Sequence, residues 1–300
     1  MAKPQRKDVF PPDRSLQARM LLVLLLGLAF DAALIAAIVL YVTSGTSKDG
    51  RWVVPVLLVF FAACAAQAHA VRLRRLVASD SARAARCAGA IEPLCLVADM
   101  KPPEVIVLRR QPPLSWASVR PFRGTRVYVT QGLVDRASDE ELQAVLAHEL
   151  SHLANRDAVV MTLVAGPPTM VIWACQFLWE RLGFRGWCFA VVLLPWLAVS
   201  PVPLAICRLF SRQRELTADR GAAMLTGSPS AVASALTRLS GELPSIPLAD
   251  LRSTGTSDLF HFLPAREYRG TDVRRIWATH PPVKVRLGRL AELEAKLQRS

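Results

Sequence analysis

The sequence predicts a mainly α-helical integral membrane protein with about four apolar helices and one hydrophilic α+β domain. Hydrophobic residues make up 52% of the chain and the mean hydropathy is positive, which is high for a purely water-soluble protein. The apolar residues are gathered in four long runs, and the segments between and after these runs hold most of the charged residues. We therefore expect membrane spans that alternate with parts of a charged domain.

The first two apolar runs predict a transmembrane hairpin. Residues 20–43 are apolar apart from Asp31, and at about 1.5 Å per residue they exceed the ~30 Å hydrocarbon core of a bilayer. Residues 52–71 form a second run of suitable length after a turn-rich link. An ionised carboxylate is unfavourable inside a span, so we expect Asp31 to make a structural polar contact, ahead of any functional role.

The distribution of positive charge predicts how this hairpin is oriented. Lys and Arg residues crowd the segment before the first run and the "RLRR" after the second, whereas the link holds only Lys48 and Arg51. Cytoplasmic loops are enriched in Lys and Arg, so both ends of the hairpin should be cytoplasmic. The protein should then be a multi-pass protein of the plasma membrane with its hydrophilic domain in the cytoplasm. The net charge of +13 forms no single patch interleaved with aromatic residues, which favours the lipid bilayer over nucleic acid as a partner.

The third and fourth apolar runs predict a second hairpin that contains several prolines. Residues 158–179 include Pro167 and Pro168, which remove helix hydrogen bonds, and residues 187–209 include three further prolines. Two interpretations stay open, a hairpin that spans the membrane and a bent or re-entrant one. In either case the short link between the runs returns the chain to the side that it left.

The hydrophilic segments predict the helices and strands of the charged domain. Residues 77–90 have a helical pattern, and residues 103–110 and 125–134 are two alternating runs rich in β-branched residues, which indicate a small sheet or hairpin. Residues 228–243 and 281–300 are amphipathic and predict two further helices.

A metal-binding pattern lies on a helix that begins near Ser138. Ser138 and Glu141 have the spacing of a capping box, which marks the start of a helix. His148 and His152 follow in the pattern H-E-x-x-H. Residues four apart lie on one helical face, so both imidazoles can bind one ion, and Glu149 can reach a water on that ion. Zinc suits such a site because it acidifies bound water at an open position.

A second acidic pattern follows the fourth apolar run. In "RELTADRGAA", Glu215 and Asp219 are one helical turn apart. Glu215 can complete the zinc ligands, while Asp219 can accept the ring N–H of a ligating histidine and fix its tautomer. The alternative is an acidic pair on a solvated helical face. The presence of both patterns in one chain favours the metal site.

Three segments together, "HELSH", "RELTADRGAA" and "ATHPPVKVRLGRL", resemble the M48 family of membrane zinc metallopeptidases. The resemblance is to its HtpX-like branch and, more distantly, to the type I CAAX prenyl proteases. It implies a gluzincin-type α+β metallopeptidase domain and a bacterial source. It also implies one Zn²⁺ per chain, bound by His148, His152 and Glu215, with Glu149 as the general base.

The resemblance implies further roles near the C-terminus and on one strand. His280 and Arg286 match the family's His-Pro-Pro-x-x-x-Arg pattern, and would face the oxyanion or order the site. The family's substrate-binding strand aligns with Ser115, Trp116 and Ala117, which lack the family's Asn. A substrate backbone can still pair with such a strand, but the side-chain contact and the substrate preference would differ.

The sequence thus predicts a domain order and a function. The parts are 1–76 with the first hairpin, 77–157 with the H-E-x-x-H helix, 158–209 with the second hairpin, and 210–300 with the E-x-x-x-D and C-terminal helices.

The expected activity is zinc-dependent endopeptidase cleavage of membrane or misfolded proteins at the cytoplasmic membrane face. The alternative is a non-proteolytic zinc-binding membrane receptor or regulatory protein. Three ligands leave a coordination position open, which favours the enzyme. Prenyl-protein processing is disfavoured because four apolar runs are too few for a large intramembrane chamber.

Overall fold

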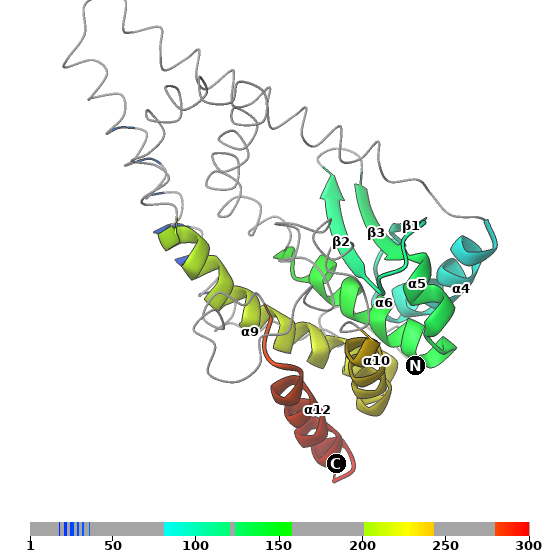
Figure 1. Ribbon diagram of the computed structural model, residues 1–300. Helices are drawn as coiled ribbons and strands as arrows, with labels where there is room; N and C mark the ends of the chain where they lie inside the picture. The colour runs from blue at the N-terminus through cyan, green and yellow to red at the C-terminus, as the bar shows by residue number, and fades with distance from the viewer. Residues whose placement is uncertain are drawn as a thin grey trace, which may run out of the picture. The chain divides into compact units, whose positions relative to one another are not determined.

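The computed structural model describes residues 81–120, 124–157, 201–242 and 280–299, together with single helical positions between residues 18 and 36 (Figure 1). Asp31 and most of the four apolar runs lie outside the described residues. Within the described parts of the chain, no helix combines the length and the apolarity that a membrane crossing requires.

The described residues form an α+β domain. Its elements are α4 (Ser81–Val97), β1 (Glu104–Leu108), β2 (Ser115–Arg120), β3 (Gly124–Thr130), α5 (Gln131–Arg136), α6 (Asp139–Ala154), α9 (Pro201–Thr226), α10 (Pro229–Glu242) and α12 (Val283–Leu297). The helices α10 and α12 occupy the two C-terminal segments for which the sequence predicts amphipathic helices.

The chain divides into two compact units that do not follow its sequence order. One unit comprises Met1–Ala18, Val77–Val159 and Arg208–Ser300, and the other comprises Arg19–Leu76 and Val160–Cys207. The segments on either side of the predicted second hairpin therefore belong to one unit. The helix α9 continues through Leu209, where the sequence predicts the apolar run to end, so residues 201–209 of that run and the E-x-x-x-D pattern share one helix.

The strands form a mixed sheet in the order β1-β3-β2. β3 is central, pairing parallel with β1 and antiparallel with β2, so β2 lies at an edge of the described sheet. The sequence allows a simple hairpin of residues 103–110 with 125–134, and this alternative is wrong because β2 intervenes and forms the hairpin with β3. Residues 131–134 are also helical, as the start of α5, where the Gly132 N–H donates to Arg110 O at 2.9 Å. A Cβ at Gly132 would lie 1.8 Å from Gln111 O, so only glycine permits this close backbone contact.

The capping box at the start of α6 is confirmed. Ser138 Oγ accepts from the Glu141 N–H at 3.2 Å, and Glu141 Oε2 accepts from the Ser138 N–H at 2.9 Å. The same carboxylate accepts from Ser234 Oγ at 2.7 Å and from Arg238 Nη1 at 3.2 Å, both on α10. Glu141, in the first turn of α6, therefore both caps this helix and attaches α10 to it.

The helix α6 lies at the centre of the domain. It contacts the sheet and α4 on one side and α10 on another, and Figure 1 shows it between the strands and the α9 and α10 helices. Its apolar residues Leu142, Val145, Leu146 and Leu150 are fully buried, and each contributes about 1.5–3 kcal/mol to stability. A helix buried on all sides can hold polar residues only where other elements supply their partners.

Candidate metal centre

His148, His152 and Glu215 converge on one point between α6 and α9. The two histidines are one helical turn apart, with 3.0 Å between their Nε2 atoms. The Glu215 carboxylate lies 3.5 Å from each of them, through Oε2 to His148 Nε2 and through Oε1 to His152 Nε2. Zinc with ligand bonds of about 2.1 Å in a tetrahedral arrangement separates its ligand atoms by about 3.4 Å. The two ring nitrogens and the two carboxylate oxygens are therefore spaced closely enough for one zinc ion to bind all three residues.

The chemistry of Glu215 also fits a bound cation. The residue is fully buried, and neither carboxylate oxygen has a hydrogen-bond partner among the described residues. Burial alone would raise the pKa of this carboxyl, but the neighbouring His280, His148 and His152 hold the pKa well below its usual range. An ionised carboxylate without hydrogen bonds is unfavourable in a protein interior unless it binds a cation.

His148 is held from behind by a buried ion pair. Its Nδ1 lies 3.1 Å from Asp219 Oδ1, which is the contact that the E-x-x-x-D spacing predicts. Arg286 donates to both oxygens of Asp219, from Nε at 2.7 Å and from Nη2 at 2.5 Å. Burial would raise the pKa of Asp219, but Arg286 and His148 lower it, so the carboxylate stays ionised. Of the two roles that the resemblance allows for Arg286, these contacts match the ordering of the site.

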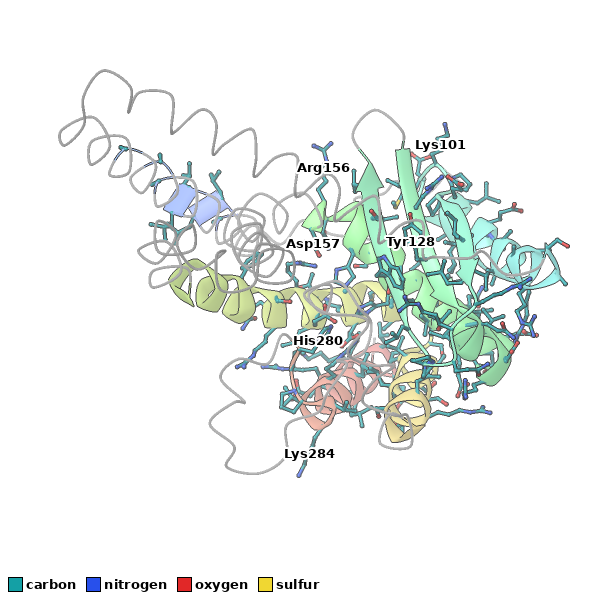
Figure 2. The ribbon with its side chains drawn as sticks, turned by 45° about the horizontal axis from the view of Figure 1, so that its top comes forward. Lys101, Tyr128, Arg156, Asp157, His280 and Lys284 are labelled. Atoms are coloured by element: carbon teal, nitrogen blue, oxygen red, sulfur yellow. The ribbon has the colours of Figure 1, made fainter. Side chains whose placement is uncertain are left out.

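His280 also lies at this centre. It is 3% exposed, and its Nε2 is 3.6 Å from Glu215 Oε2. Figure 2 shows it beside α9, on the segment that leads into α12. Without the resemblance, its position before two prolines predicts only a turn residue. The structure instead brings it to the ligand group from more than 60 residues away in the sequence.

Two residues without a role in the sequence analysis lie behind His152. Its Nδ1 is 2.8 Å from Asp157 Oδ2, and Arg214 Nε lies 3.0 Å from the same oxygen. Burial would raise the pKa of Asp157, but Arg214 and His152 lower it. Asp157 returns to His152 because the chain turns after α6 at Arg156, whose φ is 57°. The only sequence signal is an aspartate five residues after the second histidine, just beyond a helix.

Glu149 points toward the edge strand β2. Its Oε1 accepts a hydrogen bond from Ser115 Oγ at 2.7 Å, and its Oε2 has no hydrogen-bond partner among the described residues. Both residues are fully buried. Burial raises the pKa of Glu149, against the opposing effects of His148, His152 and the Ser115 hydroxyl. One oxygen is thus held in place while the other is available for chemistry.

The three residues of the predicted substrate strand lie on both faces of β2. Ser115 and Ala117 are buried on the face toward α6, while Trp116 lies on the other face. Trp116 stacks on Tyr128 of β3, with ring centroids 5.1 Å apart (Figure 2 labels Tyr128). Of these three side chains, only Ser115 bonds to Glu149, and this contact joins residues 34 positions apart.

The fold and the site define a class of protein, a mixed α+β domain with a His-Glu-His helix and a glutamate from a second helix around one buried point. Comparison with known proteins supplies the family. The model of peptidase family M48 matches residues 81–294, and the chain belongs to this family. The resemblance found in the sequence is therefore confirmed.

The chain matches more than two thirds of the length of each of two relatives named as proteases. The chain is 36% identical over 215 residues to protease HtpX homolog 2 of Methanosarcina mazei, covering 70% of this chain and 72% of the relative. It is 37% identical over 218 residues to protease HtpX homolog 1 of Streptomyces coelicolor, covering 70% and 71%. Among solved structures, the crystal structure of S. mikatae Ste24p matches with a TM-score of 0.48 at 18% identity, covering 92% of this chain and 66% of that one.

Replacing Ser115 by Ala is expected to lower kcat for peptide cleavage by about tenfold with KM unchanged, equivalent to about 1.4 kcal/mol. The substitution removes the hydroxyl that orients Glu149, and it changes the volume of the buried strand very little. Steady-state kinetics of the zinc-loaded protein measures the effect. Ser118→Ala, on the other face of the same strand, is the matched control. A Ser115→Ala protein with the kcat of the Ser118→Ala protein would contradict this role for the hydroxyl.

Proposed function

We propose that this protein is a membrane-bound zinc endopeptidase that hydrolyses peptide bonds of membrane or misfolded proteins. The observation that carries the proposal is the buried carboxylate of Glu215. It lies 3.5 Å from the Nε2 atoms of His148 and His152 and has no hydrogen bond from the described residues. Membership of a peptidase family and relatives named as proteases support the same conclusion.

The residues of the site divide the chemical work between them. A zinc ion held by His148, His152 and Glu215 would polarise the scissile carbonyl and acidify a water molecule. Glu149 Oε2 accepts the proton of that water and passes it to the leaving nitrogen, while Ser115 holds Oε1. His280, whose Nε2 lies 3.6 Å from Glu215 Oε2, would donate a hydrogen bond to the oxyanion that forms during attack.

The number of ligands favours an enzyme over a zinc-binding receptor. Structural zinc sites are normally closed by four protein ligands, whereas catalytic sites keep one position open. The metal-binding group found among the described residues has three members. The adjacent Glu149, buried beside this group with one free oxygen, has a place in a hydrolytic mechanism and none in a structural zinc site.

Several parts of the proposal rest on the sequence. The four apolar runs and the distribution of Lys and Arg support a multi-pass protein of the plasma membrane with the site on the cytoplasmic side. His152 precedes the third run closely and Glu215 follows the fourth closely, so the site would open near the membrane surface. Substrates would then be protein segments that emerge from the bilayer or expose unfolded chain there.

Cleavage of casein by the full chain in detergent is expected to stop when 1,10-phenanthroline removes the metal, and to return when Zn²⁺ is added. The reason is that neither the carbonyl nor the water is activated without the ion. Gel analysis of casein and zinc content by atomic absorption measure the two quantities together. Cleavage that continues after the zinc has been removed would contradict the proposal. A zinc-loaded protein that cleaves neither casein nor a membrane protein substrate would favour the receptor.

A further inference from the structure

We propose that Asp157 and Arg214 are positioning residues that hold His152 in the orientation needed to bind the metal. This inference rests on the proposed zinc site, and it concerns two residues to which the sequence analysis gives no role: Asp157, and Arg214 at the start of the "RELTADRGAA" segment. Asp157 is the carboxylate behind His152, and Arg214 is the cation behind Asp157. Each of the three is at least nine-tenths buried.

The contacts impose one tautomer on the ring. If Nε2 of His152 binds the metal, then Nδ1 must carry the proton, and that N–H donates to Asp157 Oδ2 at 2.8 Å. Arg214 Nη2 lies 3.4 Å from the same ring nitrogen. In this state His152 Nδ1 and Arg214 Nη2 are both hydrogen-bond donors and cannot bond to each other. The Asp157 carboxylate, which lies close to both residues, therefore connects them. A carboxylate in this position fixes the plane of the ring and increases its strength as a ligand.

Arg214 explains how a carboxylate can stay ionised in this place. Asp157 is 1% exposed, and an unpaired charge at such a depth is strongly unfavourable. Arg214, also 1% exposed, places Nε 3.0 Å from Asp157 Oδ2 and supplies the opposite charge. Arg214 immediately precedes Glu215 on α9. One turn of this helix therefore supplies the ligand Glu215 and the positive charge that neutralises Asp157 behind His152.

Each histidine therefore has a carboxylate and an arginine behind it, but the two arginines pair with their carboxylates differently. Arg286 donates to both oxygens of Asp219 behind His148. Arg214 approaches only one oxygen of Asp157, as an ion pair, and Asp157 Oδ1, Arg214 Nε and Arg214 Nη1 have no hydrogen-bond partner among the described residues. At the rings the order is reversed, because His152 Nδ1 lies 2.8 Å from Asp157 Oδ2 and His148 Nδ1 lies 3.1 Å from Asp219 Oδ1.

The Asp157–Arg214 pair also connects the two segments that flank the predicted second hairpin in the sequence. Asp157 is the last residue before the third run, and Arg214 lies five residues after the end of the fourth. The pair thus joins the chain where it leaves the site to the chain where it returns.

The test measures zinc affinity, which does not depend on proteolysis. In the full chain in detergent, Asp157→Ala is expected to weaken zinc binding by about 10–100-fold, measured by competition with a chromophoric chelator. Asp157→Asn should weaken it less, because the amide oxygen can still accept the ring N–H. It also keeps the side-chain volume, so it serves if the alanine variant does not fold. The absorption spectrum of the Co²⁺-loaded variants should change as well, since it reports ligand geometry.

Controls separate this inference from the zinc site itself. Asp135→Ala removes an exposed aspartate that is paired with Arg83, and its zinc affinity should equal that of the wild type. The losses from Asp157→Asn and Arg214→Gln should not add in the double variant, because both residues act through one contact. If both Asp157 variants bind zinc with the affinity of the wild type, this inference is overturned and the proposed function is left intact. A wild-type protein that binds no zinc would overturn both.

Discussion

Replacing Glu149 by Gln is expected to lower kcat for casein cleavage by about 10²–10⁴-fold while the protein still binds one zinc ion per chain. The amide keeps the size of the side chain and can still accept the Ser115 hydroxyl through its oxygen. It cannot take a proton from water, because its nitrogen has no lone pair available at neutral pH. The substitution therefore removes proton transfer and leaves the three ligands in place.

Two measurements and one control make this result specific. Zinc content is determined by atomic absorption on the same sample that is used for kinetics. Glu140→Gln is the matched control, since it makes the same substitution on an exposed residue of the same helix. Wild-type cleavage by the Glu149→Gln protein at full zinc content would exclude Glu149 as the general base. A variant that also loses its zinc would show that Glu149 supports the ligands.

The parts of the site that could be predicted from the sequence are those that a single helix determines. A capping box, an apolar face and two histidines four residues apart define α6, because helical geometry fixes which side chains share a face. The spacing of Glu215 and Asp219 is informative for the same reason. That these two motifs meet depends on packing between α6 and α9; the presence of both patterns in one chain favours it, and the family resemblance supports it.

Contacts between distant segments could not be predicted in this way. Ser115 and Glu149 are 34 residues apart, and Asp219 and Arg286 are 67 apart. Hydrophobic periodicity identifies which residues are buried, but it carries no information on which buried charges pair. The sheet shows the same limit, because the parallel pairing of β1 with β3 depends on the intervening β2 strand. The alternation pattern alone allows either order.

Asp157 is a different case, since it lies close to its partner in sequence. A regular helix would carry the residue five positions after His152 away from the ring. The chain instead leaves the helix at Asn155 and takes the left-handed conformation at Arg156, which brings Asp157 back. The sequence does not predict the left-handed conformation at this position, because that conformation is rare for arginine. The role of Asp157 therefore follows from the turn and not from the motif.

Replacing Asp219 by Ala is expected to destabilise the metal-free protein by about 3–5 kcal/mol, because it removes the carboxylate that accepts two hydrogen bonds from the buried Arg286 guanidinium. Glu215 Oε2, 3.8 Å from Arg286 Nη1, is too distant to replace the two hydrogen bonds that are lost. Measuring thermal unfolding in the presence of a chelator excludes any contribution from lost zinc. A fall in Tm of roughly 6–20 °C corresponds to this change for a domain of this size.

Asp135→Ala is the matched control for this measurement. Arg83 donates to Asp135 in the same bidentate manner, from Nε at 2.7 Å and from Nη2 at 3.2 Å. The Asp135 side chain is 43% exposed, so the loss of this pair should change stability by about 0–1 kcal/mol. The two variants remove the same chemical contact at different depths. Equal shifts in Tm would contradict the view that Asp219 is needed to neutralise Arg286, whereas a large difference would assign the effect to the burial of the Arg286 guanidinium.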